Sequence, residues 1–217
     1  AGGDSSEYEI SVKSAKEVLA LISSKYDARL IMIRGNAWYW EDPKGRRFSV
    51  DKNDFSLNTD DRKIRFDAVF IAIHGTPGEN GLLQGYFDMM QIPYTSCSAF
   101  CSALTFNKQA CKLYLKDYGI PMAENVLFRR ETMPDPDAII SRTGLPCFVK
   151  PNDSGSSFGV SKVKSRNELP AAIEAAFRES REVMVEAFMN GREIACGVAR
   201  IKGKTLVLPL TEIISMN

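Results

Sequence analysis

Histidine and clustered cysteine are nearly absent from this sequence of 217 residues. It contains one histidine, and none of its five cysteines forms a C-x-x-C pair. Zinc sites need Cys and His ligands close together, so these absences argue against zinc and leave a hard ion held by oxygen atoms as the remaining kind of metal. An odd number of cysteines scattered through apolar stretches predicts reduced thiols buried as small hydrophobic side chains. They are Cys97, Cys101, Cys111, Cys147 and Cys196.

The sequence also lacks long apolar runs and an excess of charge of either sign. No run approaches the roughly 20 apolar residues of a transmembrane helix, and no charged segment followed by an apolar one opens the chain. Lys and Arg number 28 against 27 Asp and Glu, which leaves no basic field for nucleic acid. With 44% hydrophobic and 25% charged residues, we expect a globular, cytoplasmic protein of one large or two modest domains, without nucleic acid or membrane as a partner.

The first hundred residues alternate between helix and strand patterns. A glycine-rich turn over residues 1–7 opens a helix, and because such a turn normally follows a strand, we expect the true N-terminus to be missing. Apolar runs at 30–33 and 68–73 predict two buried strands, and the polar stretch between them predicts a long loop or an irregular hairpin. A short helix over 82–90 follows, and this alternation is typical of open α/β domains. The first helix places its apolar residues at Val12, Ala15, Leu19 and Ile22.

A new unit begins with a helix that starts at Asn107 and ends at Gly119, with Pro121 just beyond it. Farther along, two strands flank a Gly/Ser-rich loop that is too long for a simple turn. A helix, a strand and a C-terminal hairpin complete the pattern, and no internal repeat interrupts it. The expected ranges are 147–150 and 160–163 for the flanking strands, 170–177 for the helix, 183–186 for the strand, and 194–201 with 205–213 for the hairpin.

Lys150 ends an apolar strand directly before the Gly/Ser-rich loop 151–159. An ammonium beside several backbone N–H groups and two hydroxyls suits phosphate oxygens, although loops of this composition are commonly only flexible turns. The loop follows neither the Walker A pattern nor the G-x-G-x-x-G of dinucleotide folds. A nucleotide site here therefore requires a different nucleotide-binding fold.

Two acidic residues follow at the end of a later strand. In the segment 186–189, backbone groups and an apolar side chain offer a surface for a flat base. Glu193, seven positions after Glu186, offers a carboxylate to ribose hydroxyls. Taken alone, acids at a strand end are equally compatible with solvated surface. Their proximity in sequence to the phosphate loop favours the nucleotide interpretation.

Together these segments resemble the ATP-grasp superfamily and, within it, the D-alanine–D-alanine ligase family. Residues 74–81, His-Gly-Thr-Pro-Gly-Glu-Asn-Gly, follow the family signature H-G-x-x-G-E-D-G except that Asn80 replaces Asp. The family's other motifs occur in the same order along the chain. The resemblance implies an N-terminal open parallel α/β domain over 1–97. An incomplete ATP-grasp domain over 98–217 would follow, its central subdomain extending to about 186 before the C-terminal subdomain starts.

The resemblance implies roles for residues near the first substrate. Glu7, in the opening loop that resembles G-G-x-S-x-E, would take the ammonium of the first D-alanine, and His74 would stand near its carboxylate. Ser156, the first serine of the flap, would help to hold the substrate and orient Glu7. Taken alone, His74 is equally typical of a core or loop histidine, Glu7 of an acid at a helix start and Ser156 of a loop.

For the nucleotide, the resemblance implies that Lys108 and Lys150 contact phosphates of ATP, although Lys108 alone is typical of a solvated helix face. It also implies Mg²⁺ or Mn²⁺, whose ligands lie in R-x-D and N-x-x-P segments expected beyond Asn217. No metal ligand is therefore expected within the chain, and this fragment alone is expected to be inactive. The other expected nucleotide-binding residues are Ser157, Glu186, Phe188, Met189 and Glu193.

The implied reaction joins two D-alanine molecules through an acylphosphate, releases ADP and phosphate, and supplies peptidoglycan precursors. The resemblance also implies a homodimer. A D-alanine–D-lactate ligase, another ATP-grasp carboxylate–amine ligase and an inactive nucleotide-binding module are the alternatives. The signature at His74 favours the first interpretation over another ATP-grasp enzyme.

Overall fold

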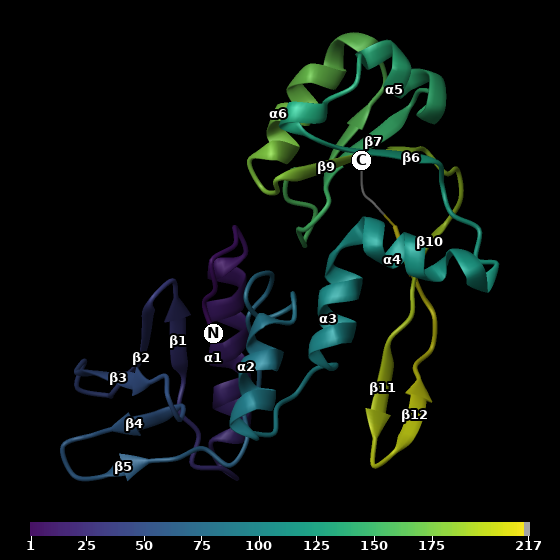
Figure 1. Cartoon of the computed structure of the whole chain (residues 1–217). Coiled ribbons are helices and arrows are strands. Elements are labelled where there is room, and N and C mark those ends of the chain that lie inside the picture. Colours follow the sequence, from purple (N-terminus) through teal and green to yellow (C-terminus); the bar gives the residue numbers. More distant parts are fainter. Residues whose placement is uncertain (215–217) are drawn as a thin grey trace. The chain divides into compact units, whose positions relative to one another are not determined.

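The computed structural model describes residues 1–214, which divide into two compact units after Ala187 (Figure 1). The first unit comprises Ala1–Ala187, and the second begins at Phe188. Each unit is described here by itself. Among the described residues, no helix is long and apolar enough to span a membrane.

Helix α1 (Tyr8–Ile22) forms where the sequence predicts the first helix. Its buried face carries Ser11 and Ala15. The Ser11 hydroxyl accepts a hydrogen bond from the Gly2 backbone N–H at 2.8 Å and donates to the Ala72 carbonyl at 2.7 Å. One side chain therefore fixes the helix to two extended segments that are far apart in sequence.

The segment expected to be a loop or an irregular hairpin is instead part of a regular antiparallel meander of five strands in the order β1-β2-β3-β4-β5. Its aromatic residues explain the regularity. Trp40 lies directly opposite Phe48 and stacks on it with ring centroids 5.6 Å apart, and Trp38 meets the edge of Phe55. The strands are β1 (Ile31–Arg34), β2 (Ala37–Glu41), β3 (Arg47–Asp51), β4 (Ser56–Asn58) and β5 (Lys63–Ile64).

The prediction of a strand over 68–73 is wrong. This segment is extended, but among the described residues it forms only one parallel bridge, Val69 to Tyr94. The ladder stops there because the Ile71 N–H is bonded to the Thr95 hydroxyl at 3.1 Å instead of a backbone carbonyl. The other isolated parallel bridge among the described residues joins Gly2 to Ile33. Parallel pairing is thus present as single bridges, while the described ladders of this unit are antiparallel.

A hydrophobic core joins the meander to the expected short helix, α2 (Leu82–Met90). Its centre is Phe87, which is 1% exposed and packs edge-on against Phe55. This cluster also takes in Ile73 at the end of the extended segment. The residues 74–81 that follow Ile73 are therefore anchored at both ends by buried apolar side chains.

Two consecutive helices, α3 (Ala99–Phe106) and α4 (Lys108–Leu115), meet at Asn107. Asn107 is extended, with φ −87° and ψ 106°, and its side chain accepts from the Ala110 N–H at 2.8 Å, so it ends one helix and caps the next. The helix predicted to start at Asn107 is confirmed. A 3₁₀ turn over Lys116–Tyr118 closes it at Gly119, whose φ is +68°. Helix α3 was not anticipated.

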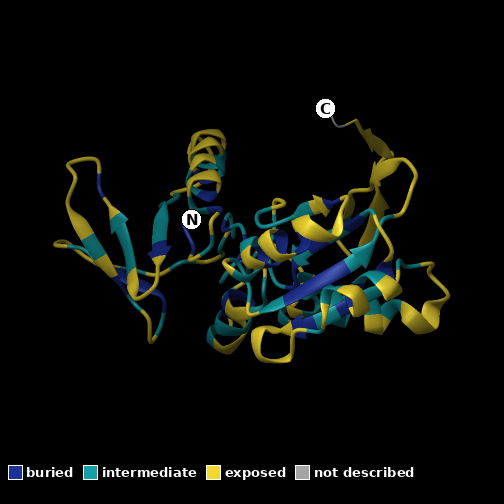
Figure 2. Ribbon diagram, turned by 90° about the horizontal axis from the view of Figure 1, so that it is seen from above, coloured by how far each residue is buried: buried dark blue, intermediate teal, exposed yellow. Residues whose placement is uncertain are grey.

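The second sheet is antiparallel throughout, in the order β6-β9-β7-β8. Helices α5 (Pro136–Thr143) and α6 (Leu169–Phe177) contribute to a single core with the strands, and buried residues concentrate there (Figure 2). The expected strands and helix of this region are confirmed, while β6 and α5 were missed. The strands are β6 (Asn125–Arg129), β7 (Cys147–Pro151), β8 (Ser161–Val163) and β9 (Glu182–Ala187), and two 3₁₀ turns lie at Arg130–Thr132 and Arg166–Glu168.

The second unit is the predicted hairpin, divided into two ladders. Strand β11 (Val198–Ile201) pairs with β12 (Lys204–Val207), and β10 (Glu193–Ala195) pairs with β13 (Thr211–Ile213). Lys202 and Gly203 form the tip with φ +50° and +79°, the left-handed pair that a two-residue hairpin needs.

The cysteines are free thiols, but the expectation that they are buried holds only for Cys147 in β7. Cys97 and Cys196 are exposed because they lie in loops, before α3 and after β10. Cys101 and Cys111 are partly exposed on α3 and α4.

Candidate active site

The loop before α1 is held against the segment that contains His74. The Ser5 hydroxyl donates to the His74 carbonyl at 2.9 Å, and the Asp4 N–H donates to the Thr76 carbonyl, also at 2.9 Å. Gly3 has φ +100°, and a Cβ there would lie 2.9 Å from the Thr76 oxygen, so only glycine fits. The loop therefore delivers Glu7 to the first turn of α1 in a fixed position.

Glu7 is buried, with 3% of its surface exposed, and it meets the Gly/Ser-rich flap. The Ser156 hydroxyl donates to Oε1 of Glu7. A Cβ on Gly155 would lie 2.6 Å from Oε2, and one on Gly75 would lie 3.2 Å from the same atom. The structure thus brings together Glu7, Ser156 and two close-packed glycines from segments that are distant in the sequence.

The flap holds two serines in an unusual backbone conformation. Ser156 has φ +44° and Ser157 has φ +60°, both in the left-handed region that favours glycine. Such residues cost about 1–3 kcal/mol each and persist where the surroundings fix them. The bond from Ser156 to Glu7 is one interaction that offsets this strain. Both serines are exposed at the tip of the flap.

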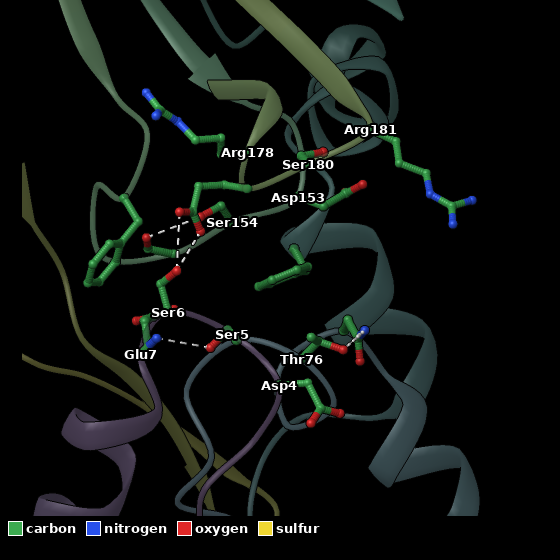
Figure 3. A pocket seen from close by; sticks show the side chains of 16 residues that line it. Asp4, Ser5, Ser6, Glu7, Thr76, Asp153, Ser154, Arg178, Ser180 and Arg181 are labelled. Carbon is green, nitrogen blue, oxygen red and sulfur yellow. Dashed lines mark hydrogen bonds between the residues drawn. The ribbon is translucent and has the colours of Figure 1, made fainter. Parts of the chain in front are cut away.

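A cavity of about 380 Å³ opens between the N-terminal loop and the base of the flap. Figure 3 shows Ser5, Ser6 and Glu7 on one side, with Asp153, Ser154 and Ser180 on the other. The Ser6 hydroxyl donates across it to both carboxylate oxygens of Glu179, at 3.1 and 2.9 Å. Asp4, Glu7, Asp153 and Glu179 are the acids that line it, while the side chains of Arg178 and Arg181 extend outward.

His74 does not line this cavity, although Gly75 and Thr76 do. Its ring lies beside α1, with Nε2 3.4 Å from the Ser14 hydroxyl. In this structure, Gly75 and Thr76 are thus the signature residues that line the cavity together with Glu7 and Asn80. The expected role of His74 at the substrate carboxylate stays a prediction.

Lys108 begins α4 and reaches into the base of the flap. Its Nζ donates to the Ser154 carbonyl at 2.8 Å and lies 3.4 Å from that of Asn152. Burial lowers the pKa of Lys108, and the nearby positive charge of Lys150 lowers it further. The two lysines that were expected to contact phosphate are thus close enough to influence each other electrostatically.

Lys150 and Glu186 form an ion pair. Lys112, which the sequence analysis missed, also pairs with Glu186. The Lys150 ammonium bonds Oε2 of Glu186, and the Lys112 ammonium lies 2.5 Å from Oε1. Burial acts to raise the pKa of Glu186, but hydrogen bonds from both lysines lower it overall. Lys112 follows Lys108 by four residues on one helix, and this spacing is the signal that could have identified it.

Asn152, at the start of the flap, was also missed. It is fully buried, and its side chain accepts from the Gln109 N–H and donates to Glu182, both at 2.9 Å. Its carbonyl accepts from the Lys108 N–H at 3.1 Å. A polar residue buried in this way ties α4 to the sheet and fixes where the flap begins.

Three of the expected nucleotide residues belong to the second unit. Phe188 and Met189 open that unit, and Met189 is 62% exposed. Glu193 is exposed and pairs with Ile213 in the backbone ladder. The grouping of these residues with Glu186 and the lysines stays a prediction.

The described residues contain no group of three His, Cys, Asp or Glu side chains suited to a metal ion. The site as described supplies ammonium groups, backbone amides and a buried carboxylate.

Known proteins match this chain over its whole length. A family described as D-ala D-ala ligase N-terminus matches residues 1–97, and D-ala D-ala ligase C-terminus matches 114–217. D-alanine–D-alanine ligases of Phocaeicola vulgatus and Flavobacterium johnsoniae are 48% and 47% identical over all of this chain. The chain spans 67% of the length of each.

Solved structures give the same result for the fold. D-alanyl-alanine synthetase A from Vibrio cholerae superposes with a TM-score of 0.87 at 31% identity, covering 100% of this chain and 66% of its own. The VanG D-Ala:D-Ser ligase from Enterococcus faecalis gives 0.78 at 35% identity, covering 97% of this chain and 67% of its own. The expected mixed α/β architecture with an ATP-grasp fold is confirmed by these neighbours. The chain belongs to the D-alanine–D-alanine ligase family.

Proposed function

We propose that this protein joins two D-alanine molecules into D-alanyl-D-alanine, using ATP and releasing ADP and phosphate, for peptidoglycan synthesis in the cytoplasm. The observation that carries the proposal is the buried Glu7 carboxylate, held by Ser156 at the base of a flap that also receives Lys108. Family membership at 48% identity supports the same activity.

Glu7 suits the ammonium group of the first D-alanine. It is a buried carboxylate in a cavity whose other acids are Asp4, Asp153 and Glu179, so the local field favours a cation. Glu7 would therefore bind and orient the amino acid and leave its carboxylate free to react. His74, whose ring now lies 3.4 Å from the Ser14 hydroxyl, would stand near that carboxylate.

Lys108 and Lys150 suit the phosphates. In the first step a carboxylate oxygen of D-alanine attacks the γ-phosphorus of ATP, and ADP leaves. In the second, the amine of another D-alanine attacks the acyl carbon, phosphate leaves and the amine loses its proton. Both steps need charge neutralisation and alignment more than a protein nucleophile, and two ammonium groups with the flap amides provide that.

Ser157 and Glu186 would complete the nucleotide site of the first unit. For Phe188, Met189 and Glu193, the resemblance to the family implies contacts with adenine and ribose. A divalent ion, Mg²⁺ or Mn²⁺, would add charge neutralisation at the phosphates. Among the described residues, no group of three His, Cys, Asp or Glu side chains could hold this ion. We further expect a homodimer with small-molecule partners only, which light scattering of the purified protein would test.

The test is release of phosphate from ATP that depends on D-alanine, with the dipeptide identified by mass spectrometry. Lys150→Ala should abolish release but leave D-alanine binding intact, whereas Lys44→Ala, at an exposed turn, should behave as wild type. Parallel reactions with D-lactate or D-serine as the second substrate test the related ligases. The assay uses the full-length protein, and absence of any D-alanine-dependent phosphate release by it would overturn the proposal.

A further inference from the structure

Glu186 carries two ammonium groups at once. Lys112 Nζ lies 2.5 Å from Oε1, and Lys150 bonds Oε2. The side chains of Lys112, Lys150 and Glu186 are 17%, 23% and 18% exposed, so all three are largely withdrawn from water. A carboxylate this deep needs a cationic partner to stay ionised.

Lys112 is fixed by more than this ion pair. Its Nζ also donates to the Ala123 carbonyl at 2.5 Å. Three residues earlier in the same helix, Gln109 accepts from the Asn125 side chain at 2.6 Å, and Asn125 lies opposite Glu186 in the β6–β9 ladder. The helix that places Lys108 at the flap thus also anchors Lys112 beside Glu186.

The proposed function, on which this inference rests, creates a conflict for Lys150. Glu186 and the phosphates of ATP would compete for the single positive charge of its ammonium. When Lys150 turns to phosphate, Lys112 is the partner that remains on the carboxylate. We infer that Lys112 is a positioning residue for ATP, which keeps Glu186 ionised and in place so that Lys150 can be released to the phosphates.

Loss of Lys112 should therefore weaken nucleotide binding. Without it, Lys150 becomes the sole cation on a buried carboxylate, and ATP must compete for it. In Lys112→Met we expect the dissociation constant and the KM for ATP to rise about tenfold with little change in kcat, since one charged hydrogen bond is at stake. Lys112→Arg should stay within about threefold of wild type, because a guanidinium can serve both Glu186 and Ala123.

The experiment measures ATP binding by titration calorimetry with the full-length protein, alongside steady-state KM and kcat. Lys116→Met, one turn farther along and exposed, is the matched control and should bind ATP as wild type does. If Lys112→Met does not fold, Lys112→Gln gives the same test, because it keeps a donor for Ala123 without the charge. A double variant tests whether Lys112 acts through Glu186. When Glu186→Gln is already present, adding Lys112→Met should raise the dissociation constant for ATP by less than about twofold.

The outcomes are distinct. A rise in the dissociation constant that Lys112→Arg reverses and Glu186→Gln cancels supports the inference. If wild type binds ATP and Lys112→Met binds it equally well, or if its effect adds fully to that of Glu186→Gln, the inference is overturned. If wild type itself binds no ATP, it is the proposed function that fails.

Discussion

Gly155→Ala should uncouple catalysis from folding, because its Cβ would fall on the Glu7 carboxylate. That Cβ would lie 2.6 Å from Oε2, and ordinary contacts begin at 3.4 Å, so the carboxylate or the flap must shift by about 0.8 Å. A displacement of about 1 Å in a positioning group can cost up to about 100-fold in rate. This factor corresponds to about 2.7 kcal/mol of transition-state stabilisation. We expect a loss of that size in kcat/KM for D-alanine.

The assay is D-alanine-dependent phosphate release, with ATP affinity and thermal unfolding measured on the same preparation. The matched control is Gly85→Ala inside α2, where a Cβ would lie 3.9 Å from that of Ala99, an ordinary contact. Gly85→Ala should keep full activity and gain up to about 1 kcal/mol of stability, since alanine favours helix. If Gly155→Ala retains kcat/KM within about threefold of wild type, the flap does not fix Glu7 as described.

Two further predictions concern the N-terminal meander. Leu57→Ala should lower the free energy of unfolding by about 2–5 kcal/mol in urea titrations, because Leu57 is fully buried in that core; a loss below about 1 kcal/mol would contradict the packing. Hydrogen bonds from Lys63 and Ser56 lower the pKa of Asp54 to about 2, so its stabilising effect is complete above the unfolded value of 3.8 and lost as pH falls through about 2. The difference in Tm between wild type and Asp54→Asn should shrink over that acidic window, and a constant difference would refute the assignment.

Local patterns were sufficient for most of the ATP-grasp part. The strand 147–150 and the helix 170–177 have apolar positions on a clear period and defined ends, and both form within a residue or two of their predicted bounds. Segment 68–73 misled because an apolar run records burial tendency but not hydrogen-bond partners. The Thr95 hydroxyl accepts the hydrogen bond from the Ile71 N–H, which a β-ladder would need, and the segment therefore forms no strand.

In the candidate site too, some residues were predictable from the sequence and others were not. Motif order predicted that Glu7 and Ser156 belong together, and the structure places them in contact across 149 positions of sequence. Lys112 and Asn152 escaped prediction because their partners, Glu186 and Glu182, are remote in sequence. Asn152 has no sequence pattern that points to its partners, whereas the four-residue spacing from Lys108 places Lys112 on the same face of its helix.

Asn80 illustrates what one letter of a motif does and does not determine. Its amide donates to the Thr76 hydroxyl at 2.7 Å, and its carbonyl oxygen lies 3.3 Å from the Leu82 N–H. An aspartate could accept at both places, so the turn does not require the amide. The charge differs, however, because Asn80 lines a cavity that already contains four acidic side chains. A fifth would raise like-charge repulsion around Glu7, and the asparagine therefore preserves the geometry of the signature while leaving this cavity less negative.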